Sequence, residues 1–81
     1  RVRLSKHAKS RMMKRGVLLP EVMQILESGI HEPDHDEWDA EHEAWNYAIE
    51  GETIEGRRLR IAVTFVEEDD VLVVTVISPG E

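Results

Sequence analysis

The stretch RRLRIAVTFVEEDDVLVVTVI, residues 57–77, decides the fold of this chain. From residue 58 to residue 65, large apolar side chains alternate with polar or small ones, and this period of two predicts a strand with one buried face. The acidic run at residues 67–70 predicts a polar turn. Residues 71–77 are apolar on both faces, which is typical of a central strand.

The preceding residues extend this sheet. Trp45, Tyr47 and Ile49 share one face of a further predicted strand, and residues 51–56 read as a turn region. At the start of the chain, Val2 and Leu4 fit a short first strand. We therefore expect three or four strands.

Helix signals occur only before Gly29. Ser5 is a good N-cap, and Gly16 is a natural left-handed residue at a helix end, so residues 6–15 are predicted to be helical. Pro20 favours the first position of a second helix, which Gly29 ends. Helices followed by a meander predict an α+β fold, with two N-terminal helices packed on one face of a three- to four-stranded antiparallel sheet.

Residues 1–81 are expected to form a single domain. The residues expected to be mostly buried are Leu4, Ala8, Met12, Val22, Ile25, Leu26, Trp45, Ile49, Leu59, Ile61, Val63 and Phe65.

Charge is divided unevenly along the chain. Residues 1–15 carry seven Lys and Arg and no acid, whereas residues 16–81 carry three Arg and all seventeen acids, so +7 and −14 give the net −7. Such asymmetry suggests an anionic ligand or an acidic partner. With no cysteine and no apolar run near the ~18 residues of a membrane span, the chain is predicted to be cytoplasmic, with no membrane association.

The segment HEPDHDEWDAEHE, residues 31–43, holds three His and seven acids. It predicts a loop, or a ragged edge strand that leads into a hairpin. His and carboxylate can bind zinc or manganese, but the spacing matches no compact motif, so neither a metal site nor another cofactor is expected. Trp38 stands among acids and suggests an exposed anchor for a partner.

The run Ser5, His7, Ala8, Arg11, Met12, Arg15, Gly16, Val17 resembles the signature S-x-H-A-x-x-R-M-x-x-R-G-I of domain-of-unknown-function family 4258. The resemblance covers nearly the whole chain. Val17 replaces the usual Ile, and Ile77 stands where an aromatic residue is common. The family's element order is similar to that of RelE/ParE-type toxins. The resemblance thus implies a toxin-like fold, and likeness of fold does not by itself deliver function.

The predicted first helix places His7, Arg11 and Arg15 on one stripe. In the functional interpretation, the two Arg clamp a phosphate and His7 transfers a proton, which makes these three the candidate catalytic residues. The candidate anion-binding residues beside them are Lys6, Lys14, Arg58 and Arg60. In the structural interpretation, Arg11 and Arg15 pair with the acids of residues 32–43, while Arg58 and Arg60 pair across the sheet with Glu50 or Glu52.

Two functions stay open from the sequence. One is a small toxin-like domain of a toxin–antitoxin type system that binds or cleaves RNA in the manner of a ribonuclease. The other is a noncatalytic module that binds a protein or forms a homodimer, with His7, Arg11 and Arg15 in a structural seam. The candidate partners are accordingly RNA, an antitoxin-like or other protein, and a second copy of the chain.

Overall fold

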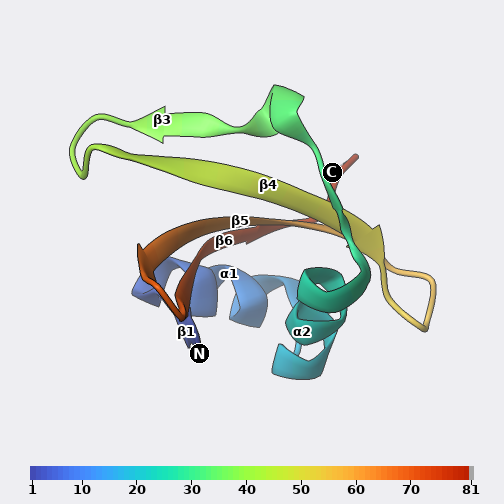
Figure 1. Ribbon diagram of the computed structural model, residues 1–81. Helices are drawn as coiled ribbons and strands as arrows, with labels where there is room; N and C mark the ends of the chain where they lie inside the picture. The colour runs from blue at the N-terminus through green and yellow to red at the C-terminus, as the bar shows by residue number, and fades with distance from the viewer. Residues whose placement is uncertain (81) are drawn as a thin grey trace.

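The computed structural model describes residues 1–80 and shows helices packed against a curved sheet (Figure 1). In chain order the elements are β1 (Val2–Leu4), α1 (Lys6–Arg15), α2 (Leu19–Ser28), β2 (Ile30–His31), the 3₁₀-helix η1 (Pro33–His35), β3 (Glu37–Asp39), β4 (Ala44–Glu52), β5 (Arg58–Glu67) and β6 (Asp70–Ile77).

The sheet is larger than predicted, and one of its strand pairs is parallel. The strand order is β1-β6-β5-β4-β2, and β3 also pairs with β4. β1 runs parallel to β6, with Val2 opposite Val71, whereas the other pairs are antiparallel. The prediction of a three- to four-stranded antiparallel sheet is therefore wrong in strand number and in the direction of one edge strand.

Two short segments account for this difference. β1 has three residues, too few to show a period, and its partner β6 is distant in sequence. Ile30 and the acidic segment 31–43 supply β2, η1 and β3, and both strands pair with the free edge of β4. Because strand pairing uses backbone amides and carbonyls, charged side chains that face solvent suit an edge strand.

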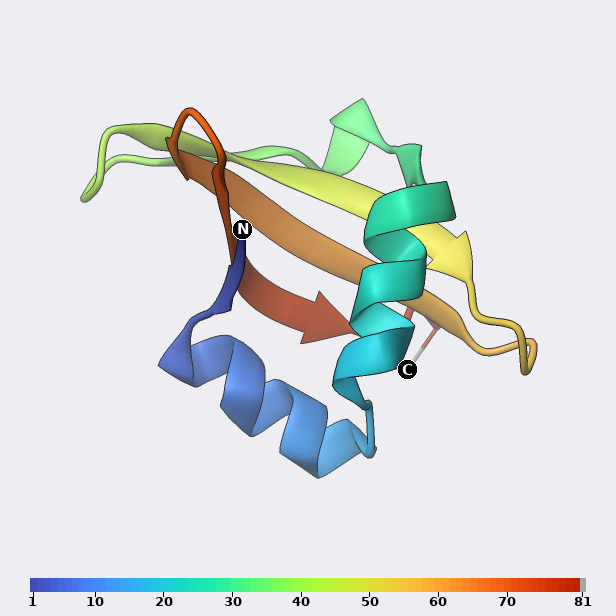
Figure 2. The same cartoon turned by 60° about the horizontal axis from the view of Figure 1, so that its bottom comes forward.

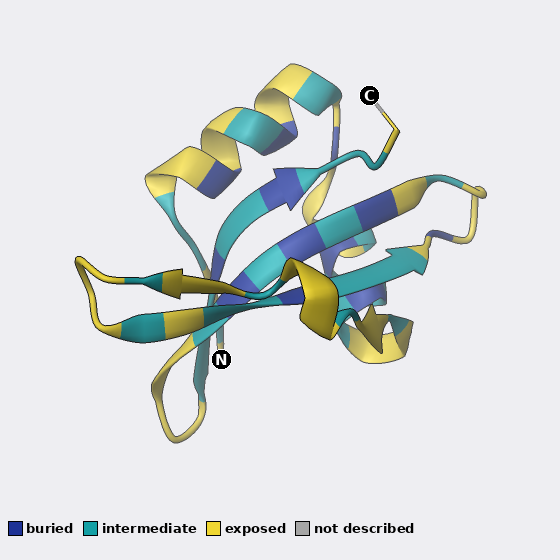
Figure 3. Cartoon of the chain, turned by 90° about the horizontal axis from the view of Figure 1, so that it is seen from above, coloured by how far each residue is buried: buried dark blue, intermediate teal, exposed yellow. Residues whose placement is uncertain are grey.

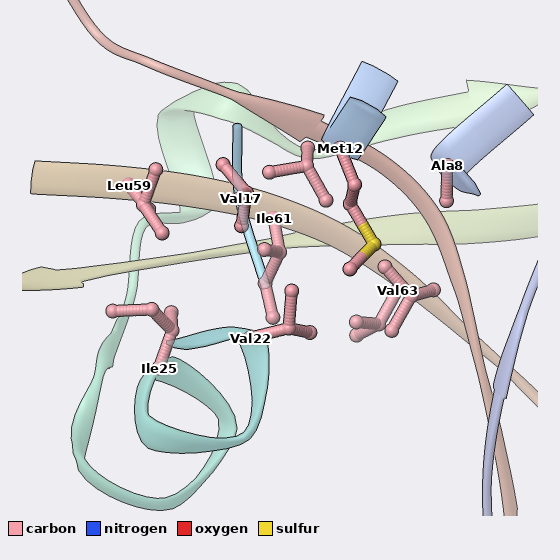
Figure 4. Close-up of a cluster of buried hydrophobic side chains, with 10 residues drawn as sticks. Ala8, Met12, Val17, Val22, Ile25, Leu59, Ile61 and Val63 are labelled. Atoms are coloured by element: carbon pink, nitrogen blue, oxygen red, sulfur yellow. The ribbon is translucent and has the colours of Figure 1, made fainter. Parts of the chain in front are cut away.

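Both helices pack on the same face of the sheet (Figures 1 and 2). α1 lies against β6, and α2 lies against β4 and β5. Their buried side chains meet those of β5 and β6 in one core, part of which is shown in Figure 4. The core residues are Ala8, Met12, Val17, Val22, Ile25, Leu59, Ile61, Val63, Val73 and Val76. Within residues 1–80, neither α-helix covers the opposite face of the sheet, where the short η1 lies beside β4.

Two residues expected in the core lie outside it. Trp45 is 47% exposed and Phe65 is 64% exposed. The alternation assigns each side chain to the correct face of its strand. However, the part of β4 that precedes Tyr47 pairs only with β3, and β5 enters the turn toward β6 soon after Phe65. Both aromatic rings lie past the area that the two helices cover. Figure 3 shows how β5 alternates between buried and intermediate residues until this end.

The ends of α1 are held by specific contacts. The Oγ of Ser5 accepts a hydrogen bond from the Ala8 amide at 2.9 Å, which confirms the predicted N-cap. Gly16 ends the helix with φ 62°, as predicted. The Arg57 guanidinium donates to the carbonyls of Arg15 and Gly16, and a cation at this position suits the negative end of the helix dipole.

Candidate functional site

A pocket of about 220 Å³ lies on the face of the sheet that the helices leave open. We call it the polar pocket. His7 of α1 and His35 of η1 line it together with side chains from four strands of the sheet. The residues with polar groups among its lining are His7, His35, Glu37, Asn46, Arg60 and Thr75. It therefore brings together two imidazoles, a guanidinium and a carboxylate.

A second pocket, of about 510 Å³, continues from the first toward the β5–β6 turn. We call it the apolar pocket, because most of the surface that lines it is apolar. Its apolar lining residues are Ala44, Phe65, Val66, Leu72 and Val74, and its polar lining residues are Ser5, His7, Asp39, His42, Asn46 and Thr64. His7, Asn46 and Val74 line both pockets, so the two form one groove with His7 at the junction.

The position of His7 depends on a clamp between α1 and β6. The backbone amide of Ser5 donates to the carbonyl of Val73 at 3.0 Å, and its Oγ donates to the carbonyl of Val74 at 2.9 Å. Val74 is the extra residue where the β5–β6 register shifts, because Ala62 faces Thr75 and Val63 faces Val73. Ala8, fully buried, lets the helix approach the sheet closely. The first turn of α1 is thus fixed beside the groove, with the His7 side chain exposed.

Arg60 is held at the groove by two partners. Its Nε donates to Glu50 Oε1 at 2.9 Å, and one terminal nitrogen lies 3.2 Å from His35 Nε2. Because a guanidinium can only donate, His35 Nε2 is the acceptor in this bond. Hydrogen bonds from Arg58 and then Arg60, with their charges, hold the pKa of Glu50 below its ordinary range. The predicted cross-strand pairing with Glu50 is confirmed for both Arg residues.

The remaining predicted site residues lie outside both pockets. Arg11 and Arg15 follow His7 on the same side of α1, but eight residues of helix span about 12 Å, so only the first turn reaches the groove. Lys6 and Lys14 are exposed on α1. Within residues 1–80, no ion pair joins Arg11 to the acidic segment. The stripe of His7, Arg11 and Arg15 is therefore not one compact site.

The acidic segment is organised by its own histidines. Asp36 Oδ2 lies 2.8 Å from His31 Nε2, and Asp36 Oδ1 accepts from the Ala48 amide at 2.8 Å. Burial acts to raise the pKa of Asp36, but the hydrogen bonds from Ala48 and His31 outweigh it, so the pKa is lowered. These contacts hold η1 over β4 and so place His35 at the polar pocket. Across the described part of the chain, no three His, Asp or Glu side chains are grouped to hold a metal.

The comparison with protein families agrees with the resemblance seen in the signature. The family described as "Domain of unknown function (DUF4258)" matches residues 4–78. The chain belongs to this family. No curated protein and no solved structure shows a significant match. The similarity to RelE/ParE-type toxins stays a prediction. Across residues 1–80 there is no helix with the length and apolar character to cross a membrane.

Much of the DUF4258 signature has a structural role here. Ser5 caps α1, Ala8 and Met12 are buried in the core, Gly16 adopts the left-handed conformation and Val17 is buried. His7 is the signature residue that lines both pockets of the groove, and Ser5 lines the apolar pocket.

Sequence reasoning missed His35, Asn46 and Thr75 as groove residues. His35 lies in a charged segment that is predicted to be exposed to solvent. Asn46 and Thr75 lie in strands, where neither residue type indicates a site. The available signal was the period of two, since Asn46 and Arg60 fall on the strand faces opposite the apolar series.

The turn between β3 and β4 provides a test of pH dependence in this DUF4258 chain. Asp39 Oδ2 lies 2.8 Å from His42 Nδ1. The hydrogen bond from the His42 side chain lowers the pKa of Asp39, and the hydrogen bond to Asp39, with the charges of Asp39 and Glu41, raises the pKa of His42. The Asp39 contribution is present above about pH 4 and is lost as pH falls through its lowered pKa. The His42 contribution is present below about pH 6.5 and is lost as pH rises through its raised pKa.

We therefore expect the turn to be most ordered between about pH 4 and 6.5, which NMR titration of the His42 ring and amide exchange at residues 40–43 would measure. Replacing His42 by Gln should remove the upper limb of this profile, whereas His7→Gln should preserve it. A His42 ring that titrates below its ordinary range would contradict the prediction.

Proposed function

We propose that the polar pocket binds single-stranded RNA and that His7 transfers a proton during cleavage of the RNA backbone. The observation that carries this proposal is the convergence of His7 with Arg60 and His35, which come from α1, β5 and η1, on one pocket of the open sheet face. Together they offer proton transfer and phosphate recognition in one place. A toxin-like role in a cytoplasmic toxin–antitoxin pair remains the wider hypothesis.

The chemistry needs these side chains and solvent water. The ribose 2′-hydroxyl loses a proton and its oxygen forms a bond to the adjacent phosphorus. The bond from phosphorus to the 5′-oxygen breaks, and that oxygen takes a proton, so the products are a 2′,3′-cyclic phosphate and a 5′-hydroxyl. His7, exposed and with no hydrogen bond to residues 1–80, is available for one of these transfers. Solvent water makes the other transfer, since His35 Nε2 already accepts from Arg60 and so helps to hold that guanidinium at the pocket.

Arg60 is suited to stabilise the charge on the phosphate. Its Nε and one terminal nitrogen are engaged, and its other terminal nitrogen makes no hydrogen bond within the described chain, so donors remain for a phosphate oxygen. Glu37 and Asn46 can accept hydrogen bonds from a ribose hydroxyl or a base. A pocket of this size admits one splayed nucleotide of a single strand, the form in which RNA sequence is usually recognised.

Binding is tested with a fluorescent single-stranded RNA of mixed sequence at several salt concentrations. Arg60→Gln should weaken binding about tenfold and lower the slope of log K against log salt by about 0.7, which is one phosphate contact on a single strand. The measurement is fluorescence anisotropy, combined with gel analysis of the RNA ends to detect a 2′,3′-cyclic phosphate.

Arg58→Gln is the matched control, because Arg58 also bonds Glu50 but lies outside the residues that line the groove. It should retain most of the affinity. The variant Arg11→Ala tests the stripe predicted from sequence and should retain affinity if the pocket alone binds RNA. Equal losses in Arg58→Gln and Arg60→Gln would show diffuse attraction and contradict a site in the polar pocket. So would a wild-type chain that neither binds nor cleaves RNA.

A further inference from the structure

We propose that the apolar pocket docks a basic, apolar segment of a partner protein. This surface does not depend on RNA activity, since its evidence comes from the other end of the groove. Val66 is 51% exposed, lies where the β5–β6 register shifts, and lines the pocket together with Thr64. Leu72, which is opposite Thr64 in the register, and Val74 continue the apolar surface across β6. An apolar floor of this kind, with no helix over it, favours an apolar ligand.

Two acidic loops flank this end of the groove. Because β4 and β5 are antiparallel, the start of β4 lies beside the end of β5. The β3–β4 turn and the β5–β6 turn therefore lie at the same end of the sheet, as Figures 1 and 3 both show. Residues 39–43 and 67–70 together carry seven carboxylates.

Five of these seven carboxylates have no counter-charge within residues 1–80. Asp39 is paired with His42, and Asp70 is paired with Arg3. Those with no ion pair in the described chain are Glu41, Glu43, Glu67, Glu68 and Asp69, and all five are exposed. An apolar floor between unpaired carboxylates is complementary to a segment that presents apolar side chains on one side and Lys or Arg on the other.

The same charges argue against RNA at this end. Phosphates would meet five unpaired carboxylates, whereas the side chains of the polar pocket offer them Arg60 and two His. His7 and Asn46 line both pockets, so a segment in the apolar pocket would lie against His7. A docked partner would therefore exclude RNA from the adjoining site, which links the two ends of the groove.

The test uses the full chain and three synthetic peptides of twelve residues: alternating Leu and Lys, alternating Leu and Glu, and alternating Ser and Lys. Isothermal titration calorimetry should detect binding of the Leu–Lys peptide, with the other two at least about tenfold weaker. Val66→Ser, which removes exposed apolar surface, should weaken Leu–Lys binding several-fold to about tenfold. Thermal melts would verify that this variant is folded.

Charge is tested by the double variant Glu41→Lys/Glu68→Lys, with Glu27→Lys/Glu55→Lys as the matched control. Glu27 lies in the last turn of α2, and Glu55 lies in the β4–β5 turn. The control therefore changes the net charge by the same amount as the test variant, but at positions away from the groove. Only the first pair should reduce Leu–Lys affinity. Equal effects of both pairs, or similar binding of all three peptides, would overturn the proposal. If the chain self-associates and Val66→Ser abolishes this, the surface belongs to a second copy. If RNA binds in a Val66-dependent way and the peptide does not bind, the surface belongs to nucleic acid. Either result would also overturn the proposal.

Discussion

Replacing His7 by alanine should abolish RNA cleavage by this chain while leaving RNA affinity and folding nearly unchanged. Removal of a proton-transfer group typically costs about 10²–10⁴ in rate, which is the largest effect expected of any substitution on the open face. His7 is exposed and makes no hydrogen bond within residues 1–80, so its loss leaves no buried group unsatisfied. The measurement is the single-turnover rate of formation of the 2′,3′-cyclic phosphate, alongside anisotropy and a thermal melt.

Lys9→Ala is the control for His7→Ala, because Lys9 is exposed on the same helix and lines neither pocket. Its cleavage rate should stay within about threefold of wild type. The corresponding change in activation free energy is smaller than the ~1.4 kcal/mol that a tenfold change in rate represents. Wild-type cleavage by His7→Ala would remove His7 from the chemistry. A lower melting temperature without a rate effect would instead make His7 a structural residue of the DUF4258 signature.

Gly29→Ala is expected to destabilise the fold more than most single substitutions would. A Cβ at this position would lie 2.5 Å from the Ile25 carbonyl oxygen, 2.8 Å from Ile49 Cγ2 and 3.0 Å from the Glu50 carbonyl oxygen. The Ile25 carbonyl belongs to α2 and the Glu50 carbonyl to β4, so the end of α2 would have to change shape and also move away from β4. We expect a loss of about 3 kcal/mol in the free energy of unfolding, and a fall in Tm of more than about 10 °C, both measurable by urea and thermal unfolding.

The comparison with Gly16→Ala separates two reasons for glycine. Gly29 has φ −73°, which any residue adopts, so its requirement comes from close packing alone. Gly16 has φ 62° and open space where a Cβ would lie. Alanine there should therefore lower the free energy of unfolding only by the cost of the left-handed conformation, about 1 kcal/mol. Equal destabilisation by both substitutions would show that α2 can move away from β4 at little cost.

The local signals in the sequence were sufficient for the helices and for the face of each long strand. The N-cap at Ser5, the left-handed Gly16 and the alternation in β5 depend on neighbouring residues, and each is found in the structure. The number of strands was not predictable in this way. β1 and β3 have three residues each and are strands only because β6 and β4 offer them backbone partners.

The candidate site shows the same division. The sequence by itself determined the helix that carries His7, the Arg60 strand face and the separation of charge along the chain. Only the tertiary structure decided that His7 meets Arg60 and His35 in one groove while Arg11 does not, and that Trp45 and Phe65 lie beyond the core. The reason is physical: helical and strand periods follow from local backbone geometry, whereas a groove depends on how far each element extends past its neighbours and on contacts such as Ser5 to Val74.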